Sequence, residues 1–160
     1  MENKFNMCPM CGSKKIECVK NRKWICPDCG FDLYCNVASA VGVIIKDKQN
    51  NVLFEVRGKE PRKGFYAVPG GFVDFDEPAE EAAIRECKEE LDITLEVGDI
   101  FTEAVHEYPD ITIRLTVFNA KIAEGVPKLI EHNDLKWITP DEIPDYEFCP
   151  ADAGILKKLM

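Results

Sequence analysis

Three glutamates near the middle of the chain are spaced so that they could bind a metal ion together. Glu86, Glu89 and Glu90 lie within the segment IRECKEELDI. A helix turns about 100° per residue, so their side chains project within one arc, and the apolar stripe is separate from it: Ile84, Cys87 and Leu91. Like charges at this spacing weaken a helix by roughly 0.2–0.5 kcal/mol per pair, and neither Arg85 nor Lys88 lies within the arc. A bound divalent cation would remove that repulsion.

The rest of the predicted helix leaves two interpretations open. Small residues share the carboxylate arc and would let a loop or ligand approach closely: Ala79, Ala82 and Ala83. Pro78 suits a first helical turn, with Asp76 or Glu77 at the positive end of the helix dipole. A glutamate-rich helix taken alone is more often a solvated charged surface than a metal site.

Residues at fixed spacing around this helix favour the metal site. In chain order they are Gly71, Glu77, Arg85, Glu86, Glu89, Glu90 and Ile93, after Pro69 and Gly70. This pattern resembles the signature of the Nudix hydrolases, which cleave a diphosphate linked to another group. Two positions depart from it. Cys87 stands where an aliphatic residue is usual, a mild change because buried cysteine behaves as a small hydrophobe. Asp92 replaces the glycine after the helix; aspartate tolerates a left-handed conformation, so we expect reduced stability and retained function.

The resemblance implies a set of catalytic roles. Glu86, Glu89 and Glu90, with the carbonyl of Gly70 or Gly71, would hold Mg²⁺ or Mn²⁺ against the substrate's phosphates. Glu89, or another carboxylate from a loop, would orient and deprotonate the attacking water. Arg85 and Glu77 would pair with each other or fix a ligand carboxylate.

Substrate contacts are expected from two further segments. By resemblance, Arg57 at the end of a strand contacts a phosphate, although a surface arginine is an equally good interpretation. The segment from Phe148 to Leu156 is similar to the start of the last helix in Nudix enzymes that hydrolyse nucleoside triphosphates. There Phe148 would contact the substrate and Asp152 would read the base, unless Asp152 only interacts with the helix dipole.

The favoured substrate is therefore a nucleoside triphosphate or a modified one, cleaved to a monophosphate and pyrophosphate. ADP-ribose or a dinucleotide is the alternative. Nudix enzymes that split NADH carry a Ser-Gln-Pro-Trp-Pro-Phe-Pro stretch, and the corresponding segment here, EAVHEYPDI, does not match it. A non-catalytic nucleotide sensor or scaffold is a third interpretation, although a pure binding module has no need of three clustered glutamates.

The N-terminal residues contain two copies of a cysteine knuckle, CPMCG and CPDCG. Two such turns supply four thiolates for a tetrahedral ion: Cys8, Cys11, Cys26 and Cys29. They resemble the zinc ribbons, in which zinc is structural and substitutes for a core that so short a segment cannot form. A pair of redox dithiols is the less favoured alternative.

We expect an α+β protein: a small β zinc ribbon over 1–36, then a Nudix domain over 37–160 with a mixed sheet between helices. Val37–Ile45 and Val52–Arg57 are predicted to form a hairpin. Further strands are predicted at Thr94–Val97, Ile100–Glu107, Ile111–Ala123 and Leu135–Ile138, and a terminal helix at Ala151–Leu159.

Composition restricts the partners. The net charge is −9 over 160 residues. Residues 1–36 carry +2 and the remainder −11, which suits a protein that meets an anionic substrate through divalent cations. The basic ribbon leaves nucleic-acid binding open as a less favoured expectation. No membrane span or targeting peptide is visible, so a cytoplasmic location is expected. Dimerisation is common in the family, but no residue indicates an interface.

Overall fold

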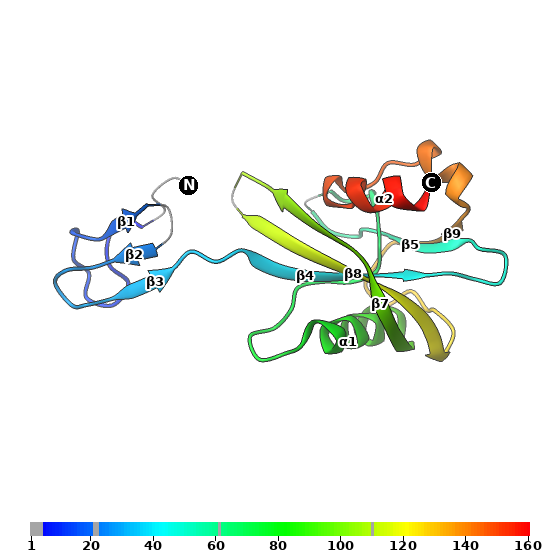
Figure 1. The fold of residues 1–160 in the computed structure, drawn as a ribbon, viewed down its shortest axis with the longest axis horizontal. Helices are drawn as coiled ribbons and strands as arrows, with labels where there is room; N and C mark the ends of the chain where they lie inside the picture. The colour runs from blue at the N-terminus through cyan, green and yellow to red at the C-terminus, as the bar shows by residue number, and fades with distance from the viewer. Residues whose placement is uncertain (1–4, 21–22, 61, 110) are drawn as a thin grey trace. The chain divides into compact units, whose positions relative to one another are not determined.

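The computed structural model describes residues 5–20, 23–60, 62–109 and 111–160 (Figure 1). The chain divides into two compact units, Met1–Val37 and Ala38–Met160. None of the described helices has the length and apolar character needed to cross a bilayer.

The first unit contains a small antiparallel sheet. Its strands β1 (Glu17–Val19), β2 (Lys23–Ile25) and β3 (Asp32–Tyr34) pair in chain order. Among the described residues of this unit, the buried ones are Cys8, Ile16, Trp24 and Cys26, and the Phe5 ring lies edge-on to Trp24. Two of these four residues are cysteines, so the apolar core alone is very small.

The second unit is built around a mixed sheet in the order β4-β8-β7. Strand β4 (Ala38–Ile45) runs parallel to β8 (Thr112–Glu124), and β8 runs antiparallel to β7 (Thr94–Glu107). The predicted break at Gly98 and Asp99 is wrong: β7 continues through it, with a register shift between Val97 and Ile100. A β-bulge accommodates the extra residues without ending the strand.

A second sheet has the order β6-β5-β9, formed by β5 (Val52–Val56), β6 (Tyr66–Ala67) and β9 (Asp134–Ile138). The predicted hairpin between the first two strands of this unit is therefore wrong. A single bridge, Lys46 to Val52, joins them, and each strand then pairs within a different sheet. Apart from Ser39 and Glu55, both strands carry only apolar or small residues on their two faces, so their hydrophobic pattern does not specify which neighbours they pair with.

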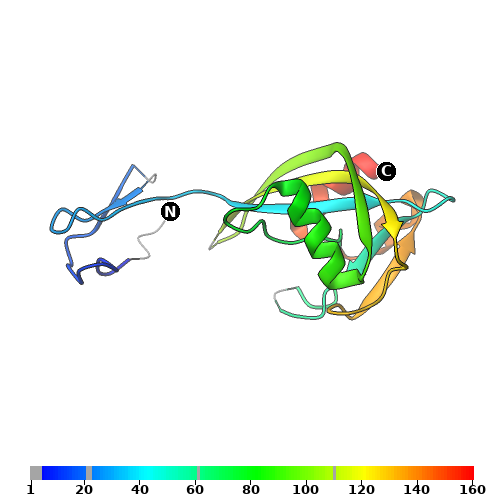
Figure 2. The same cartoon turned by 90° about the horizontal axis from the view of Figure 1, so that it is seen from below.

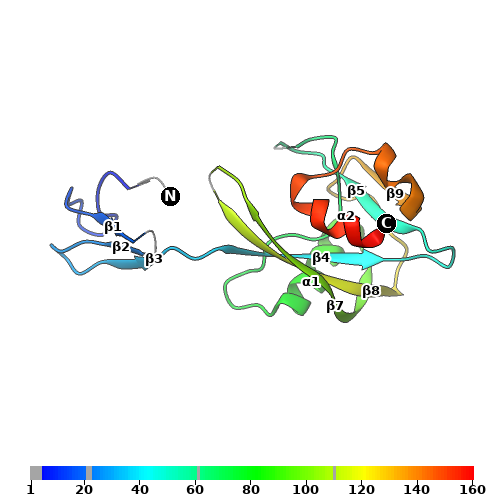
Figure 3. The same cartoon turned by 45° about the horizontal axis from the view of Figure 1, so that its top comes forward.

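Helix α1 (Ala79–Leu91) covers one face of the mixed sheet, and α2 (Ala153–Leu159) covers the other (Figures 2 and 3). Alternate residues of β4 divide accordingly. Val41, Val43 and Ile45 pack in the core with α1, whereas Ile44 packs in the core with α2. The 3-10 helices η1 (Pro140–Asp145) and η2 (Pro150–Asp152) lead into α2. The expected α+β class, with a mixed sheet between helices, is confirmed.

Candidate active site

Helix α1 places the three motif glutamates along the edge of its buried face. Pro78 is the residue before the helix and not part of its first turn, and Cys87 and Leu91 are buried as expected. The side chains of Glu90 and Glu86 are 12% and 16% exposed, whereas that of Glu89 is 58% exposed. Two carboxylates are thus partly withdrawn from water and one is open to it.

Ala82 and Ala83 face the hydrophobic core. Both are fully buried in the core with Cys87 and Leu91, so the expectation that they leave room beside the carboxylates is wrong. The buried face of α1 is wider than the stripe that the sequence indicated. A face turned toward a sheet includes small residues that the strands can approach closely.

A glycine, and not an alanine, lies against the Glu86 carboxylate. A Cβ atom added to Gly71 would come within 2.4 Å of the Glu86 Cδ atom, and one added to Gly70 within 2.2 Å of the Val41 carbonyl oxygen. Gly70 also has a φ of +144°. The Gly71 carbonyl accepts a hydrogen bond from the Val41 backbone N–H at 2.8 Å. The glycine loop is therefore fixed to β4 and in contact with Glu86.

Arg85 connects the acidic residues. Its guanidinium donates hydrogen bonds to both carboxylate oxygens of Glu77 at 2.8 Å, to Glu86 at 2.9 Å and to Glu89 at 3.3 Å. It also donates to the Phe72 carbonyl at 3.0 Å. Arg85 starts outside the carboxylate arc, but its long side chain folds along the helix surface and reaches both Glu77 and Glu86. These bonds fix the orientation of Glu86 relative to the glycine loop.

The electrostatics follow from these contacts. The hydrogen bond from Arg85 lowers the pKa of Glu77 to about 2. Burial raises the pKa of Glu86, opposed by Arg85 and reinforced by the charges of Glu90 and Glu89. The repulsion expected between like charges on one helix is thus present, and the charge of Arg85 offsets part of it. A divalent cation would neutralise more.

The third glutamate has different partners. His132 Nε2 lies 2.9 Å from Glu90 Oε1 and 3.2 Å from Glu55 Oε1. Glu55 is only 2% exposed, and burial, with the nearby charge of Glu90, raises its pKa well above the usual value. Neither Glu55 nor His132 was predicted from the sequence. A carboxylate inside the apolar strand VLFEV was the available signal for Glu55.

A cavity of about 530 Å³ opens beside the glycine loop. Gly70, Gly71 and Glu55 form part of its wall, and Arg57, Arg62 and Asp152 line it further on. Its remaining lining is largely apolar and includes Tyr108 and Phe72. A nucleotide-sized ligand in this cavity would therefore lie next to the carboxylates of α1.

Asp152 is the buried polar group of this cavity. It is 4% exposed; burial raises its pKa to about 7, against an opposing hydrogen bond from the Val68 backbone N–H and the charge of Arg57. Among the described residues its Oδ2 atom has no hydrogen-bond partner. A carboxyl group with this pKa can either accept or donate a hydrogen bond near neutral pH.

Phe148, the third expected substrate contact, lies elsewhere. Its ring packs edge-on against Phe54 and is tilted against Tyr66, in the core cluster below α2. It is not among the residues that line the cavity. The aromatic residues of the cavity wall are instead Phe72 and Tyr108, which follow the glycine loop and strand β7.

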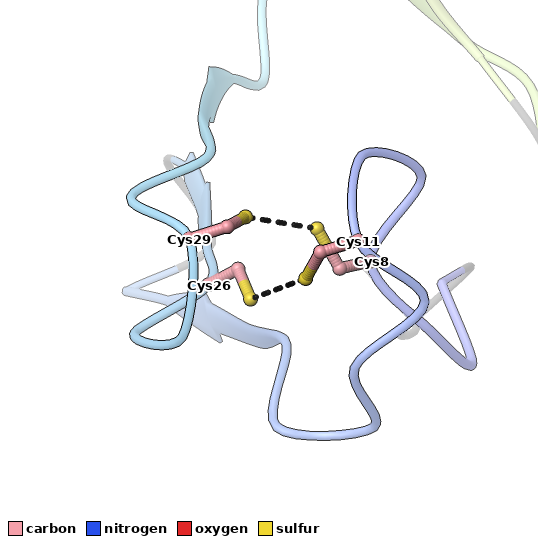
Figure 4. A group of neighbouring side chains, drawn as sticks. All are labelled: Cys8, Cys11, Cys26 and Cys29. Atoms are coloured by element: carbon pink, nitrogen blue, oxygen red, sulfur yellow. Dashed lines mark hydrogen bonds between the residues drawn. The ribbon is translucent and has the colours of Figure 1, made fainter.

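The four knuckle cysteines converge in the first unit (Figure 4). Their Sγ atoms all lie within 4.8 Å of one another, with 3.6 Å between Cys8 and Cys29 and 3.7 Å between Cys11 and Cys26. A tetrahedral Zn²⁺ with bonds of about 2.3 Å needs sulfur atoms about 3.8 Å apart, so the cluster fits this ion. Gly12 and Gly30 have φ values of +73° and +77°, and each donates its N–H to the carbonyl of the first cysteine of its knuckle.

The second unit matches a known family. Residues 37–159 fit the family description "NUDIX domain". The chain is 29% identical to the CTP pyrophosphohydrolase of Escherichia coli K12 over 120 residues, 75% of this chain and 89% of that protein. It is 41% identical to the ADP-ribose pyrophosphatase of Methanocaldococcus jannaschii over 80 residues, 50% of this chain and 46% of that protein.

Two comparisons extend through the cysteine knuckles. The chain is 26% identical to the NAD-capped RNA hydrolase NudC of Pseudomonas aeruginosa over 162 residues, 99% of this chain and 54% of that protein. It thus spans about half the length of NudC and of the M. jannaschii protein. A crystal structure of a NUDIX hydrolase from Nitrosomonas europaea is similar with a TM-score of 0.74 and 27% identity, covering 97% of this chain and 88% of that one.

Proposed function

The chain belongs to the Nudix family of hydrolases, and on that premise we propose that it is a divalent-metal-dependent pyrophosphohydrolase of a nucleoside triphosphate. The products would be the monophosphate and pyrophosphate. The observation that carries the proposal is the contact between Gly71 and Glu86. It joins the Glu86 carboxylate of α1 directly to the wall of a nucleotide-sized cavity.

The carboxylates of Glu86, Glu89 and Glu90 would hold Mg²⁺ or Mn²⁺, together with the carbonyl of Gly70 or Gly71. Hard oxygen donors of this kind match both ions. The bound ion would neutralise the charge that builds on the phosphate oxygens. Arg85, held by Glu77, keeps the Glu86 carboxylate against the glycine loop, so both are positioning residues.

Glu89 is the best placed of the three to act as the general base. Its side chain is the most exposed, so an attacking water can reach its carboxylate. A single long hydrogen bond from Arg85 holds it at 3.3 Å, which leaves an oxygen free to accept the proton of that water.

The cavity lining offers groups for both the phosphates and the base of a nucleotide. Arg57 and Arg62 carry the positive charge that a triphosphate requires, and a guanidinium can bind two phosphate oxygens at once. Asp152 would bind the base. Its ionised form accepts a hydrogen bond from an exocyclic amine such as that of cytosine. The similarity to a CTP pyrophosphohydrolase over most of that protein supports a cytidine nucleotide.

ADP-ribose is the second candidate. The similarity to an ADP-ribose pyrophosphatase supports it, and adenine also carries an exocyclic amine. The Asp152 contact serves both bases, so the cavity lining alone favours neither ligand.

The unit that precedes the Nudix domain we propose to be a zinc ribbon over 1–36, with one structural Zn²⁺ on Cys8, Cys11, Cys26 and Cys29. Four thiolates close the coordination shell, so the ion would have no open position for catalysis. The spacing of the sulfur atoms supports this assignment.

A substrate panel tests the proposal. Pyrophosphate and phosphate release would be measured with Mg²⁺ over the common nucleoside triphosphates, 8-oxo-dGTP, ADP-ribose and NADH. We expect Glu89→Gln and Glu90→Gln to lower turnover by at least about a hundredfold with the fold unchanged. Glu81→Gln, an exposed glutamate in the first turn of the same helix, is the matched control and should keep wild-type turnover. Full activity in both active-site variants would exclude this site.

A further inference from the structure

Glu55 on β5, Glu90 on α1 and His132 in the segment before β9 lie close together. We propose that these three residues form a binding site for one divalent transition-metal ion, with Mn²⁺ the best match, distinct from an oxygen-only magnesium site. One oxygen from each carboxylate and one imidazole nitrogen lie within 4.8 Å of one another. The three donors come from separate elements, so tertiary folding alone brings them together.

The distances fit a metal shell. Nε2 of His132 lies 2.9 Å from Glu90 Oε1 and 3.2 Å from Glu55 Oε1. With metal–ligand bonds of about 2.1 Å, neighbouring donors of an octahedral ion are about 3.0 Å apart and those of a tetrahedral ion about 3.4 Å. The site therefore needs only small side-chain shifts to enclose an ion.

Burial supplies an independent reason for a ligand. The Glu55 side chain is only 3% exposed, and its Oε2 atom has no hydrogen-bond partner among the described residues. The same holds for Oε2 of Glu90. An unsatisfied buried polar atom costs about 1–3 kcal/mol, and more if it is charged. His132 Nε2 lies near the Oε1 atoms of Glu55 and Glu90 and leaves both Oε2 atoms unsatisfied. A cation would attract all four carboxylate oxygens.

The donor set selects the ion. Mg²⁺ binds carboxylates, carbonyls and water, and it rarely takes imidazole. Two carboxylates with one imidazole suit first-row transition ions, and Mn²⁺ accepts the high oxygen content. Thiolates select zinc, so the cysteine cluster of the first unit would not compete for Mn²⁺.

The position of Glu55 gives the site a relation to the substrate cavity. Glu55 lines that cavity and also contacts His132, while Glu90 belongs to the helix that carries the proposed catalytic carboxylates. An ion here would lie between the cavity and α1. The inference shares Glu90 with the proposed function but does not require that the chain hydrolyse any particular nucleotide.

Nitrogen ligation provides a test without an activity assay. The chain contains two histidines, His106 and His132. One equivalent of Mn²⁺ would be added to the full chain without nucleotide, and its electron spin echo envelope modulation recorded. We expect coupling to one ¹⁴N nucleus in the wild type and in His106→Gln, and its loss in His132→Gln. His106 is the matched control because it lies on β7, its ring packs against Tyr108, and it is not part of the Glu55, Glu90 and His132 cluster.

Glu55→Gln is the second variant, since it keeps the side-chain size while removing one anionic ligand. We expect it to weaken Mn²⁺ binding at the nitrogen-ligated site at least about tenfold, measured by the free Mn²⁺ signal. Bound Mn²⁺ without ¹⁴N coupling in the wild type, or coupling that survives His132→Gln, would overturn the inference. Oxygen-only Mn²⁺ with intact hydrolysis would leave the proposed function standing, so the two can fail separately.

Discussion

Gly71→Ala should separate catalysis from stability at this site. The added Cβ atom would lie 2.4 Å from Cδ and 2.5–2.6 Å from the carboxylate oxygens of Glu86, where ordinary contacts begin at 3.4 Å. The Glu86 carboxylate must therefore move by about 1 Å. A displacement of that size in a reacting constellation costs on the order of a hundredfold in rate. We expect kcat to fall by about that factor.

The fold should tolerate the same change. The clash is with the far end of a flexible side chain, and the backbone of Gly71 is outside the left-handed region. We expect the free energy of unfolding to change by less than about 1 kcal/mol. Gly70→Ala should behave in the opposite way, because its Cβ atom would meet the Val41 backbone and its φ is +144°. That variant should lose stability by several kcal/mol.

The assay is pyrophosphate release under saturating Mg²⁺ and nucleotide, with urea unfolding of the same samples. Gly154→Ala is the control: its Cβ atom would meet no heavy atom within 4 Å, and it lies in helix α2, where alanine is favoured. Wild-type kcat in Gly71→Ala would refute the argument that the position of Glu86 against the glycine loop controls the reaction. Equal loss of stability in both glycine variants would refute the distinction between them.

Three further predictions follow from named residues. Burial raises the pKa of Asp152 from 3.8 to about 7, so between these values the folded state holds a proton that the unfolded state has released. As the pH rises from about 4 to 7, the free energy of unfolding should therefore fall by up to about 1.4 kcal/mol per pH unit. Urea unfolding from pH 4 to 8 should show this slope flattened in Asp152→Asn. Zinc analysis should find one ion per chain in the wild type and none in Cys11→Ser. In a Trp137→Phe background, the Cys11→Ser change should shift the fluorescence of Trp24 to longer wavelength, because Trp24 is buried beside the cysteines. Asp92 ends α1 with a φ of 54° and accepts hydrogen bonds from Lys88 and Lys128. This position should tolerate glycine better than alanine, and chemical denaturation should show that Asp92→Ala lowers the free energy of unfolding by about 1–2 kcal/mol.

Local features of the fold were predictable because they depend on neighbours in the chain. Helix α1 follows from its apolar stripe, and the left-handed Asp92 at its end follows from the position of the missing glycine. The four cysteines of the knuckles are three residues apart in pairs, so their turns are also local. In each case a pattern spanning one or two turns fixes the geometry.

Strand pairing was not predictable in the same way. Val37–Ile45 and Val52–Arg57 have a turn sequence between them, yet β4 pairs in parallel with β8, whose residues lie 75 positions further along the chain. Strands β4 and β5 are buried on both sides over most of their length, so no exposed polar face restricts the choice of partner. The widening of the buried face of α1 to include Ala82 and Ala83 has the same origin, since it depends on which sheet the helix covers.

The sequence by itself determined the family, the helix that carries Glu86, Glu89 and Glu90, and the four-cysteine cluster, because residue type and short-range spacing specify each of them. Only the tertiary structure decided what surrounds those glutamates. Three features bring together residues from separate elements: the contact of Gly71 with Glu86, the cluster of Glu55 and His132 with Glu90, and the place of Asp152 in the cavity wall. Burial, charge compensation and contact between distant segments exist only once the chain has folded, and these determine what the carboxylates can bind.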